Sequence, residues 1–306
     1  MINGVKKNLW QTMKANLIIA NPTSGQGKGA RVLASAMDYC EKLRIPYQVI
    51  AASSLQESLK ELSDKDLSFF ERVLVIGGDG MIHHVINALS SSEPMRTLIG
   101  IIPAGTGNDF ARALGLDIKR PIRNLDMYLS NEPRFLDLGE VNGVRFGAIC
   151  STGFDSIVNE RANQKKWPTG RRKYDLAMVQ ELPRFKPRHY SITIDGQVRE
   201  VKAMLIAVGN GSSYGGGMKV CPDAKVSDGL LDIMILKPVP KFEFLRIFPK
   251  VYSGKHIHHP QVEILRGSRI EIAGEAVTYA DGERIAPTPV KIKCLPSALL
   301  TWSQHD

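Results

Sequence analysis

Three short loops carry the residues whose types and spacing could do chemistry. Each loop is rich in glycine and follows an apolar run; the loops are Asn21 to Gly29 (NPTSGQGKG), Gly77 to Gly80 (GGDG) and Pro103 to Arg112 (PAGTGNDFAR). Glycine lets the main chain approach an anion closely, and the N–H groups at the start of a following helix point toward that anion. The loops therefore indicate phosphate binding. The first lacks the spacing of a Walker A or GxGxxG motif, and alone it is equally typical of a plain turn.

The second and third loops are more specific. In GGDG, three glycines surround one acid, and a turn needs only one or two such residues. The carboxylate of Asp79 could bind Mg²⁺, directly or through water, or could order the loop. In the third loop, Gly-Thr-Gly predicts a tight crossing of the main chain. Asn108 or Asp109 is then expected to cap the following helix, with Arg112 in reach of a phosphate.

The first 135 or so residues alternate strand-like and helix-like patterns, which predicts an α/β layer with parallel strands. The expected strands are 16–20, 47–51, 72–76 and 98–102, and the expected helices are 30–43, 55–62 and 81–89. The three loops then follow the carboxyl ends of strands, where ligands bind in open α/β sheets.

Beyond Phe135 the pattern changes to short alternating segments with Asp-Gly turns, which is typical of an antiparallel sandwich or barrel. We expect strands at 190–194, 201–208, 231–236, 262–265 and 269–272, interrupted by a helix over 173–182. From Val290 the chain predicts a strand and a short helix that return to the first domain. The expected domains are 1–135 with 290–306, which carries the phosphate-binding loops, and 136–289.

Five motifs in order and spacing resemble the diacylglycerol kinase catalytic-domain family, which also contains sphingosine and ceramide kinases. They are NPTSG, GGDG, PAGTGNDFAR, Asp228-Gly229-Leu230-Leu231-Asp232 and Asp281-Gly282-Glu283, and they span the chain from Asn21 to Glu283. The resemblance implies an α/β plus all-β fold. Its N-terminal α/β domain would be similar to those of NAD kinase and phosphofructokinase, and its C-terminal lobe would be an antiparallel β-sandwich. A cleft is expected between them.

The resemblance also implies roles for individual residues. Those implied to contact ATP are Asn21, Pro22, Thr23, Ser24, Gly25, Gly77, Gly78, Asp79, Gly80, Thr106, Asn108 and Asp109. Magnesium would be held near Lys225, Asp228 and Leu230, by the Asp carboxylate and main-chain carbonyls. Asp281 or Glu283 would be the general base. For both acidic turns an ordinary hairpin remains an alternative.

One departure stands inside the second motif. The family usually continues GGDG with Thr and then an Asn-Glu pair, whereas this chain reads Met81-Ile82-His83-His84. A thioether cannot donate the hydrogen bond of a Thr hydroxyl. Adjacent histidines point in different directions on a helix, so a metal site shared by His83 and His84 is not expected.

The resemblance implies a lipid kinase that uses ATP and Mg²⁺, most simply for converting diacylglycerol to phosphatidic acid in phospholipid biosynthesis. Two alternatives remain open. One is a degenerate relative that binds nucleotide or lipid without kinase activity, which the departure at Met81 motivates. The other is NAD kinase, which shares GGDG; PAGTGNDFAR and Asp228-Gly229-Leu230 favour the lipid kinases over it.

Charge points to the same class of partner. The net charge is +9, and residues 160–188 contain nine Lys/Arg and three acids, with Trp167 and Tyr174 among them. Such a window favours anionic membranes, although a solvated helix face is an equal alternative. No nucleic-acid partner is expected, and a homodimer is left open. No apolar run approaches the ~20 residues of a membrane span, and residues 1–16 lack a secretory signal. We expect a cytoplasmic protein in peripheral contact with membranes.

Overall fold

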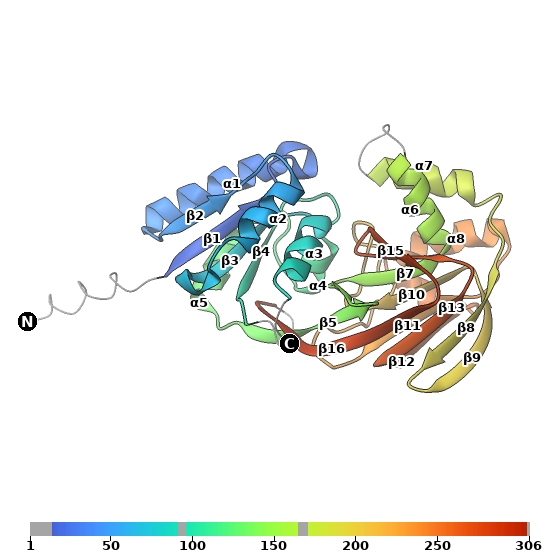
Figure 1. Cartoon of the computed structure of the whole chain (residues 1–306). Coiled ribbons are helices and arrows are strands. Elements are labelled where there is room, and N and C mark those ends of the chain that lie inside the picture. Colours follow the sequence, from blue (N-terminus) through green and yellow to red (C-terminus); the bar gives the residue numbers. More distant parts are fainter. Residues whose placement is uncertain (1–13, 91–95, 165–170, 305–306) are drawn as a thin grey trace, which may run out of the picture. The chain divides into compact units, whose positions relative to one another are not determined.

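The computed structural model describes residues 14–90, 96–164 and 171–304, which form two compact units (Figure 1). The first unit comprises the described residues up to Gly105 together with Leu116–Arg134 and Leu299–Gln304. The second unit comprises Thr106–Gly115 and Phe135–Ala298. Residues 106–115, expected in the first domain, therefore lie in the second unit, and the returning segment begins at Leu299 rather than at residue 290.

The first unit is built on a parallel sheet with the strand order β2-β1-β3-β4. Its strands are β1 (Ala15–Ala20), β2 (Tyr47–Ile50), β3 (Phe70–Gly77) and β4 (Ile99–Pro103). The central strands are almost continuously apolar and buried, as expected for a parallel sheet covered on both faces. The predicted α/β layer is confirmed, and the glycine loops follow β1, β3 and β4.

Four helices belong to the first unit: α1 (Ser24–Leu43), α2 (Leu55–Ser63), α3 (Asp79–Ala88) and α5 (Arg123–Ser130). In α1, Val32, Ala36 and Cys40 recur every four residues and are buried, so one face of the helix packs inward. The first turn of α1 is irregular at residues 25–27, and regular helix follows, close to the predicted start at residue 30.

A C-terminal segment completes the first unit. Thr301 donates its hydroxyl to the carbonyl of Ile99 at 2.7 Å, and the indole of Trp302 stacks on Tyr128 with ring centroids 4.5 Å apart. The guanidinium of buried Arg72 lies 5.4 Å from the centre of the Trp302 ring.

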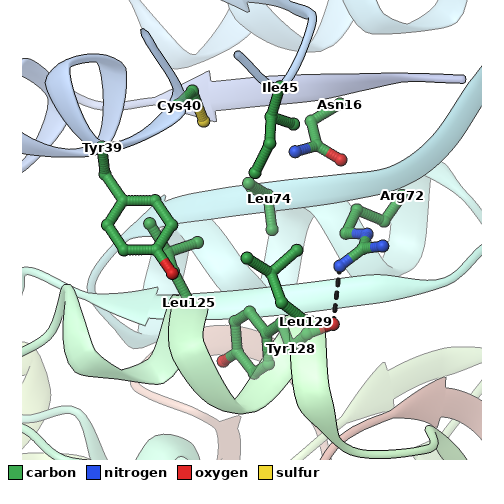
Figure 2. Close-up of a pocket in the computed structure, with 9 residues that line it drawn as sticks. All are labelled: Asn16, Tyr39, Cys40, Ile45, Arg72, Leu74, Leu125, Tyr128 and Leu129. Atoms are coloured by element: carbon green, nitrogen blue, oxygen red, sulfur yellow. Dashed lines mark hydrogen bonds between the residues drawn. The ribbon is translucent and has the colours of Figure 1, made fainter. Parts of the chain in front are cut away.

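A small cavity of about 10 Å³ lies beside Arg72, between the sheet and residues of α1 and α5 (Figure 2). Figure 2 shows Arg72 donating to the carbonyl of Tyr128, at 2.7 Å. The cavity is close to the smallest volume that accommodates one water molecule. It therefore belongs to the packing of this unit rather than to a ligand site.

The second unit contains two six-stranded sheets, with the orders β12-β11-β10-β7-β14-β15 and β6-β5-β16-β13-β8-β9. Apolar side chains from both sheets, among them Ile206, Ile233, Ile270 and Ile292, form one buried cluster. The predicted antiparallel sandwich is confirmed. The strands are β5 (Arg134–Val141), β6 (Val144–Phe146), β7 (Ile149–Gly153), β8 (Arg188–Ile194), β9 (Gln197–Ala203), β10 (Leu205–Gly209), β11 (Leu231–Leu236), β12 (Val262–Gly267), β13 (Arg269–Gly274), β14 (Val277–Ala280), β15 (Glu283–Pro287) and β16 (Val290–Thr301).

Two predictions of secondary structure were wrong. The expected strand over 201–208 is two strands, because β9 pairs with β8 in one sheet and β10 pairs with β7 and β11 in the other. The chain changes sheets at Met204, which lies between them. From Val290 the chain forms one long strand, β16, in place of a strand and a short helix.

Four helices belong to the second unit: α4 (Asp109–Ala113), α6 (Phe154–Gln164), α7 (Arg171–Glu181) and α8 (Lys241–Val251). The helix predicted over 173–182 corresponds to α7, whereas α6 and α8 were not anticipated. Among the described residues, no helix is both long enough and apolar enough to cross a membrane.

Candidate functional site

The main chains of the three glycine loops meet at the carboxyl edge of the first unit's sheet. A Cβ atom on Gly25 would lie 2.2 Å from the carbonyl oxygen of Ala104, and one on Gly78 would lie 3.0 Å from the Cα of Gly105. The amide of Ala104 donates to the carbonyl of Gly77 at 2.8 Å. A side chain therefore has no room at Gly25 and little room at Gly78, where the Ser24 hydroxyl is also close, at 3.7 Å from the same Cβ position.

The first loop is shaped by its own side chains and by left-handed residues. Asn21 Oδ1 accepts hydrogen bonds from the main-chain N–H of Thr23 at 3.0 Å and from its hydroxyl at 2.8 Å. Gly25, Gln26 and Gly27 follow with φ of 57°, 59° and 85°. Consecutive N–H groups in such turns form concave anion-binding surfaces. Pro22 and Ser24, also predicted contacts, are half-buried in the same loop.

The second loop leads directly into α3. Gly78 occupies the N-cap position, and Asp79 and Gly80 form the first turn of the helix. The N-terminal N–H groups of a helix have no partners within the helix, and its dipole favours an anion there. As the sequence predicted, the loop therefore combines glycines, which let the main chain approach a ligand closely, with the start of a helix.

Met81 packs against Gly77, where a Cβ atom would lie 2.6 Å from the Cβ of Met81. Met81 and His83 are buried and His84 is half-buried. The two imidazole rings are perpendicular, with centroids 5.3 Å apart. Within the described part of the chain, no three His, Cys, Asp or Glu side chains group so as to hold a metal ion.

The third loop ends in the second unit, where the carboxylate of Asp109 binds a second glycine-rich segment, Gly215–Gly217. Its carboxylate accepts the N–H of Gly216 and the N–H of Gly217, both at 2.7 Å, and the hydroxyl of Ser213 at 3.1 Å. Burial raises the pKa of Asp109, although the two N–H donors act in the opposite direction. Asp109 therefore fixes the position of the Gly215–Gly217 segment.

The expected cap of α4 takes a different form. Asn108 is at the N-cap position in the left-handed conformation, but its side chain makes no capping hydrogen bond. Asp109 is the first residue of the helix, and its carboxylate is engaged by Gly216 and Gly217 instead. Thr106, the other predicted contact of this loop, is exposed.

Asp281 lies in the tight turn between β14 and β15. Asp281 and Gly282 have φ of 50° and 88°, the left-handed pair typical of a two-residue hairpin. The carboxylate of Asp281 accepts the N–H groups of Gly147 at 2.8 Å, Ala148 at 2.9 Å and Ile149 at 3.3 Å. Glu283 is half-buried at the start of β15, where it pairs with Ala280. The hairpin and the predicted catalytic acids therefore coexist in one turn.

The segment at Gly147 connects the Asp281 turn with the third loop. The ring of Phe110 packs on Gly147 so closely that a Cβ atom there would lie 2.6 Å from it. Asn210 donates its amide to the carbonyls of Gly147 at 2.8 Å and Asp137 at 3.1 Å. The stretch 147–149 is thus in contact with the Asp281 turn, with Phe110 of the third loop and with Asn210.

The turn predicted to bind magnesium is held by ionic contacts. Asp228 Oδ1 accepts the N–H of Leu230 at 3.1 Å, and Asp228 Oδ2 contacts the guanidinium of Arg266. Arg266 also binds Asp232 at 2.9 Å. Asp137 supports the turn by accepting the N–H groups of Gly229 at 2.7 Å and Ser297 at 2.8 Å. Lys225, the remaining predicted ligand, is exposed.

These residues fit magnesium in donor type. One carboxylate with main-chain carbonyls and several waters is a common oxygen set for Mg²⁺. Arg266 is a competing cation for the same carboxylate, so any metal at Asp228 shares that oxygen environment with a guanidinium.

Sequence reasoning missed several residues that organise this region: Asp137, Asp155, Asn210, Ser213, Gly215–Gly217 and Arg266. The run of three consecutive glycines was the one signal visible in the sequence, because such a run favours backbone conformations that other residues avoid. In the structure all three adopt positive φ, from 61° to 104°. Asp137, Asn210, Ser213 and Arg266 act through partners distant in sequence, which no local pattern indicates.

Asp155 is a buried carboxyl at the start of α6. The residue lies just after β7 in the chain and is 8% exposed, and its Oδ1 accepts the N–H of Ser156 at 2.9 Å. Its Oδ2 makes no hydrogen bond within the described structure. Burial raises the pKa of Asp155 to about 6.

Two family models match the chain, one in each half. The diacylglycerol kinase catalytic domain matches residues 15–141, and the YegS C-terminal NAD kinase beta sandwich-like domain matches residues 148–302. The chain is similar to a diacylglycerol kinase of Mycobacterium tuberculosis, with 34% identity over 288 residues and 92% of each chain covered. It is also similar to a diacylglycerol kinase of Bacillus subtilis, with 31% identity, 85% of this chain and 86% of the relative covered.

The fold is similar to the crystal structure of a diacylglycerol kinase from Bacillus anthracis. The TM-score is 0.70 at 24% sequence identity, and 96% of this chain and 98% of the other are covered. At this identity the likeness establishes the fold alone, and it extends over both units.

Replacing Asp155 with Asn is expected to flatten the pH dependence of stability. Because the folded pKa is raised to about 6, the unfolded chain loses this proton first as pH rises, so the wild type loses stability between about pH 4 and pH 6. The loss should reach about 3 kcal/mol at neutral pH. Urea unfolding from pH 4 to pH 8 measures it, with Asp223→Asn at an exposed position as the control. Parallel curves for wild type and Asp155→Asn would contradict the assignment.

Proposed function

Because the chain belongs to the diacylglycerol kinase catalytic-domain family, a family of lipid kinases, we propose that it transfers the γ-phosphoryl group of ATP to a lipid hydroxyl. The proposed acceptor is diacylglycerol and the product phosphatidic acid, so the protein would act at a membrane surface in phospholipid biosynthesis. The observation that carries the proposal is the junction of the three glycine loops at Gly25, Gly78 and Ala104. That junction supplies main-chain donors where a triphosphate would bind.

The first unit would bind the nucleotide. The left-handed residues Gly25 and Gln26 and the first turn of α3 would offer N–H groups at one edge of the sheet, and such groups hold phosphate oxygens without bulk. Asn21 and Thr23 would keep the first loop in shape through their mutual hydrogen bonds. Asp79 would act on the nucleotide through a magnesium ion or a water.

The second unit would supply the base. We assign this role to Asp281, because three main-chain N–H donors fix its carboxylate in place. As the acceptor oxygen forms its bond to the γ-phosphorus, the bond between that phosphorus and the bridging oxygen breaks and ADP leaves. The hydroxyl proton passes to Asp281. A weak base suffices, because in a loose transition state positioning contributes more than proton abstraction.

Magnesium, when bound, offsets the negative charge that develops on the transferring phosphoryl group and the leaving oxygen. The residues that would hold a magnesium ion in the second unit are Asp228, through its carboxylate, and Lys225 and Leu230, through their carbonyls. Asp137 would orient that turn by binding the N–H of Gly229. Arg266 would balance the charge of Asp228 and Asp232.

A non-catalytic nucleotide-binding role is the second candidate, and Met81 motivates it. Its buried side chain packs on Gly77, where the family carries a Thr hydroxyl near the phosphates. The main-chain donors of α3 are independent of that side chain, and for this reason we favour the kinase.

Phosphoryl transfer tests the function directly. The full chain is incubated with labelled ATP·Mg²⁺ and mixed micelles that carry diacylglycerol, sphingosine or no lipid alcohol, beside an aqueous NAD control. Label in phosphatidic acid is the expected result. Label in NAD alone would establish NAD kinase, and intact ATP binding without label in any acceptor would favour the non-catalytic alternative.

Gly25→Ala is expected to weaken ATP binding by at least roughly tenfold. The new Cβ would meet the Ala104 carbonyl at 2.2 Å in a residue with φ of 57°, so both loops must shift. Gly27→Ala is the matched control: it has similar left-handed strain, about 1–2 kcal/mol, but nothing lies within 4 Å of its Cβ. Isothermal titration with ATP separates them. Equal affinities for the two variants would remove the junction from nucleotide binding.

Asp281→Asn is expected to lower kcat by roughly a hundredfold or more while ATP affinity is kept. The amide keeps the size of the side chain but loses the base and one acceptor for the N–H groups of 147–149. Glu283→Gln is the matched control in the same hairpin, with an expected loss below roughly tenfold. Thermal melts check that both variants fold. If Glu283→Gln shows the larger loss, the base is Glu283; unchanged turnover in both excludes the turn from catalysis.

A further inference from the structure

The exposed face of α8 is apolar. Phe242 and Leu245 are 63% and 49% exposed. Together with exposed Pro249 they are three and four residues apart, so they share one side of the helix. The opposite side is buried through Phe244 and Ile247. Large apolar side chains gathered on an exposed face indicate an interaction surface.

Exposed apolar side chains also occur on α7. Leu176 and Val179 are 36% and 58% exposed, so four of the nine exposed large apolar side chains among the described residues lie on these two helices. The helices are connected, because Lys241 donates its ammonium to the carbonyl of Pro183, just after α7. Figure 1 shows α6, α7 and α8 gathered in one part of the second unit. We call Leu176, Val179, Phe242 and Leu245 the α7–α8 surface.

The packing beneath the α7–α8 surface is aromatic. The ring of Phe154, at the start of α6, contacts Phe185 with centroids 5.0 Å apart and Phe244 with centroids 5.2 Å apart. Phe185 follows α7 and Phe244 lies on α8. Through the ring of Phe154, the buried rings therefore connect α8 with the segment that follows α7.

The residues around the α7–α8 surface are basic. Lys241, Arg246 and Lys250 are exposed on α8, and Arg184 and Lys186 are exposed just after α7. The guanidinium of Arg246 lies 5.7 Å from the centre of the Phe242 ring. Glu243, the one acid in the sequence of α8, is hydrogen-bonded to His259 at 2.9 Å. An anionic partner is therefore complementary to this surface.

Part of the basic window that the sequence analysis noted lies outside the described residues, namely Lys165, Lys166 and Trp167. The side chains of Arg171, Arg172, Lys173 and Tyr174 are likewise not described. The described basic residues near the α7–α8 surface are those of α8 and of the segment that follows α7.

We infer that the α7–α8 surface docks the protein on an anionic lipid bilayer, with Phe242 and Leu245 entering the boundary between headgroups and acyl chains. Interfacial helices combine aromatic and leucine side chains with Lys and Arg in this way, and anionic leaflets attract the basic residues. A protein partner is less complementary, because Lys is depleted where proteins meet. The inference rests on the proposed lipid acceptor, since docking would bring the enzyme to it.

Vesicle sedimentation without ATP tests the apolar part of the surface. Vesicles of phosphatidylcholine with phosphatidylglycerol are compared with phosphatidylcholine alone. Phe242→Ala/Leu245→Ala should weaken binding to the anionic vesicles by roughly tenfold or more, since two large apolar side chains no longer leave water. The matched control is Phe69→Ala/Val198→Ala, at residues 70% and 67% exposed on other elements. An equal loss in control and test variants would overturn the inference.

A second pair of variants tests the charge. Arg246→Glu/Lys250→Glu should abolish the preference for anionic vesicles and reduce the salt dependence of binding. The control is Lys119→Glu/Lys202→Glu, which makes the same change of net charge at exposed residues elsewhere. If both pairs lose binding equally, overall charge and not the α7–α8 surface attracts the membrane, and the inference fails.

Two readouts separate this inference from the kinase proposal. With a short-chain diacylglycerol dispersed in water as acceptor, Phe242→Ala/Leu245→Ala should keep wild-type turnover, while turnover on vesicles falls. Vesicle binding that depends on Phe242 without phosphoryl transfer to any acceptor would support the docking surface and reject the kinase. Size-exclusion chromatography tests whether the α7–α8 surface binds a second copy of the chain instead. If Phe242→Ala/Leu245→Ala changes the oligomeric state but leaves vesicle binding unchanged, the inference is overturned in favour of self-association.

Discussion

The tightest steric constraint in the first unit lies in its glycine loops, where neighbouring main-chain atoms leave no room for a side chain. At Gly25 and Gly29 any Cβ would lie little more than 2 Å from a carbonyl oxygen, far inside van der Waals contact. The carboxyl ends of β1, β3 and β4 are brought to one edge by parallel pairing, and the glycines allow the loops to close on each other there. The chemistry proposed for this unit depends on that backbone contact.

In the second unit, aspartate carboxylates hold the loops in position. Asp109 holds Gly216 and Gly217, Asp137 holds Gly229 and Ser297, and Asp281 holds the stretch 147–149, in each case by accepting main-chain N–H groups. Charged acceptors form the stronger class of hydrogen bond, and each bridges segments far apart in sequence. Loops that need precise placement are thus fixed to the sheets by three aspartates. This explains why residues 106–115 belong to the second unit, since Asp109 connects them to it.

The sequence predicted the parallel sheet, the sandwich and the three loops, because periodicity and glycine spacing are local signals. It failed where the structure depends on partners distant in sequence. The break at Met204 lies inside an unbroken apolar run, and only the pairing of β9 and β10 with different sheets reveals it. The capping role expected of Asn108 or Asp109 was plausible locally, but the carboxylate of Asp109 binds Gly216 and Gly217. Arg266 was invisible as a partner of Asp228 because 38 residues separate them.

Met81 shows how a departure from a motif can be absorbed. A Thr at this position would place a hydroxyl beside the second glycine loop, whereas Met81 folds its side chain back over Gly77, which has no side chain to oppose it. The thioether is buried with Ile82 and His83 in the packing of α3. The helix therefore keeps its position and its N-terminal N–H groups, which belong to the main chain and not to residue 81. A loop whose hydrogen-bond donors are main-chain groups can lose a side-chain donor without losing its geometry. The loss of the Thr hydroxyl would therefore weaken the affinity for nucleotide before it changed the fold.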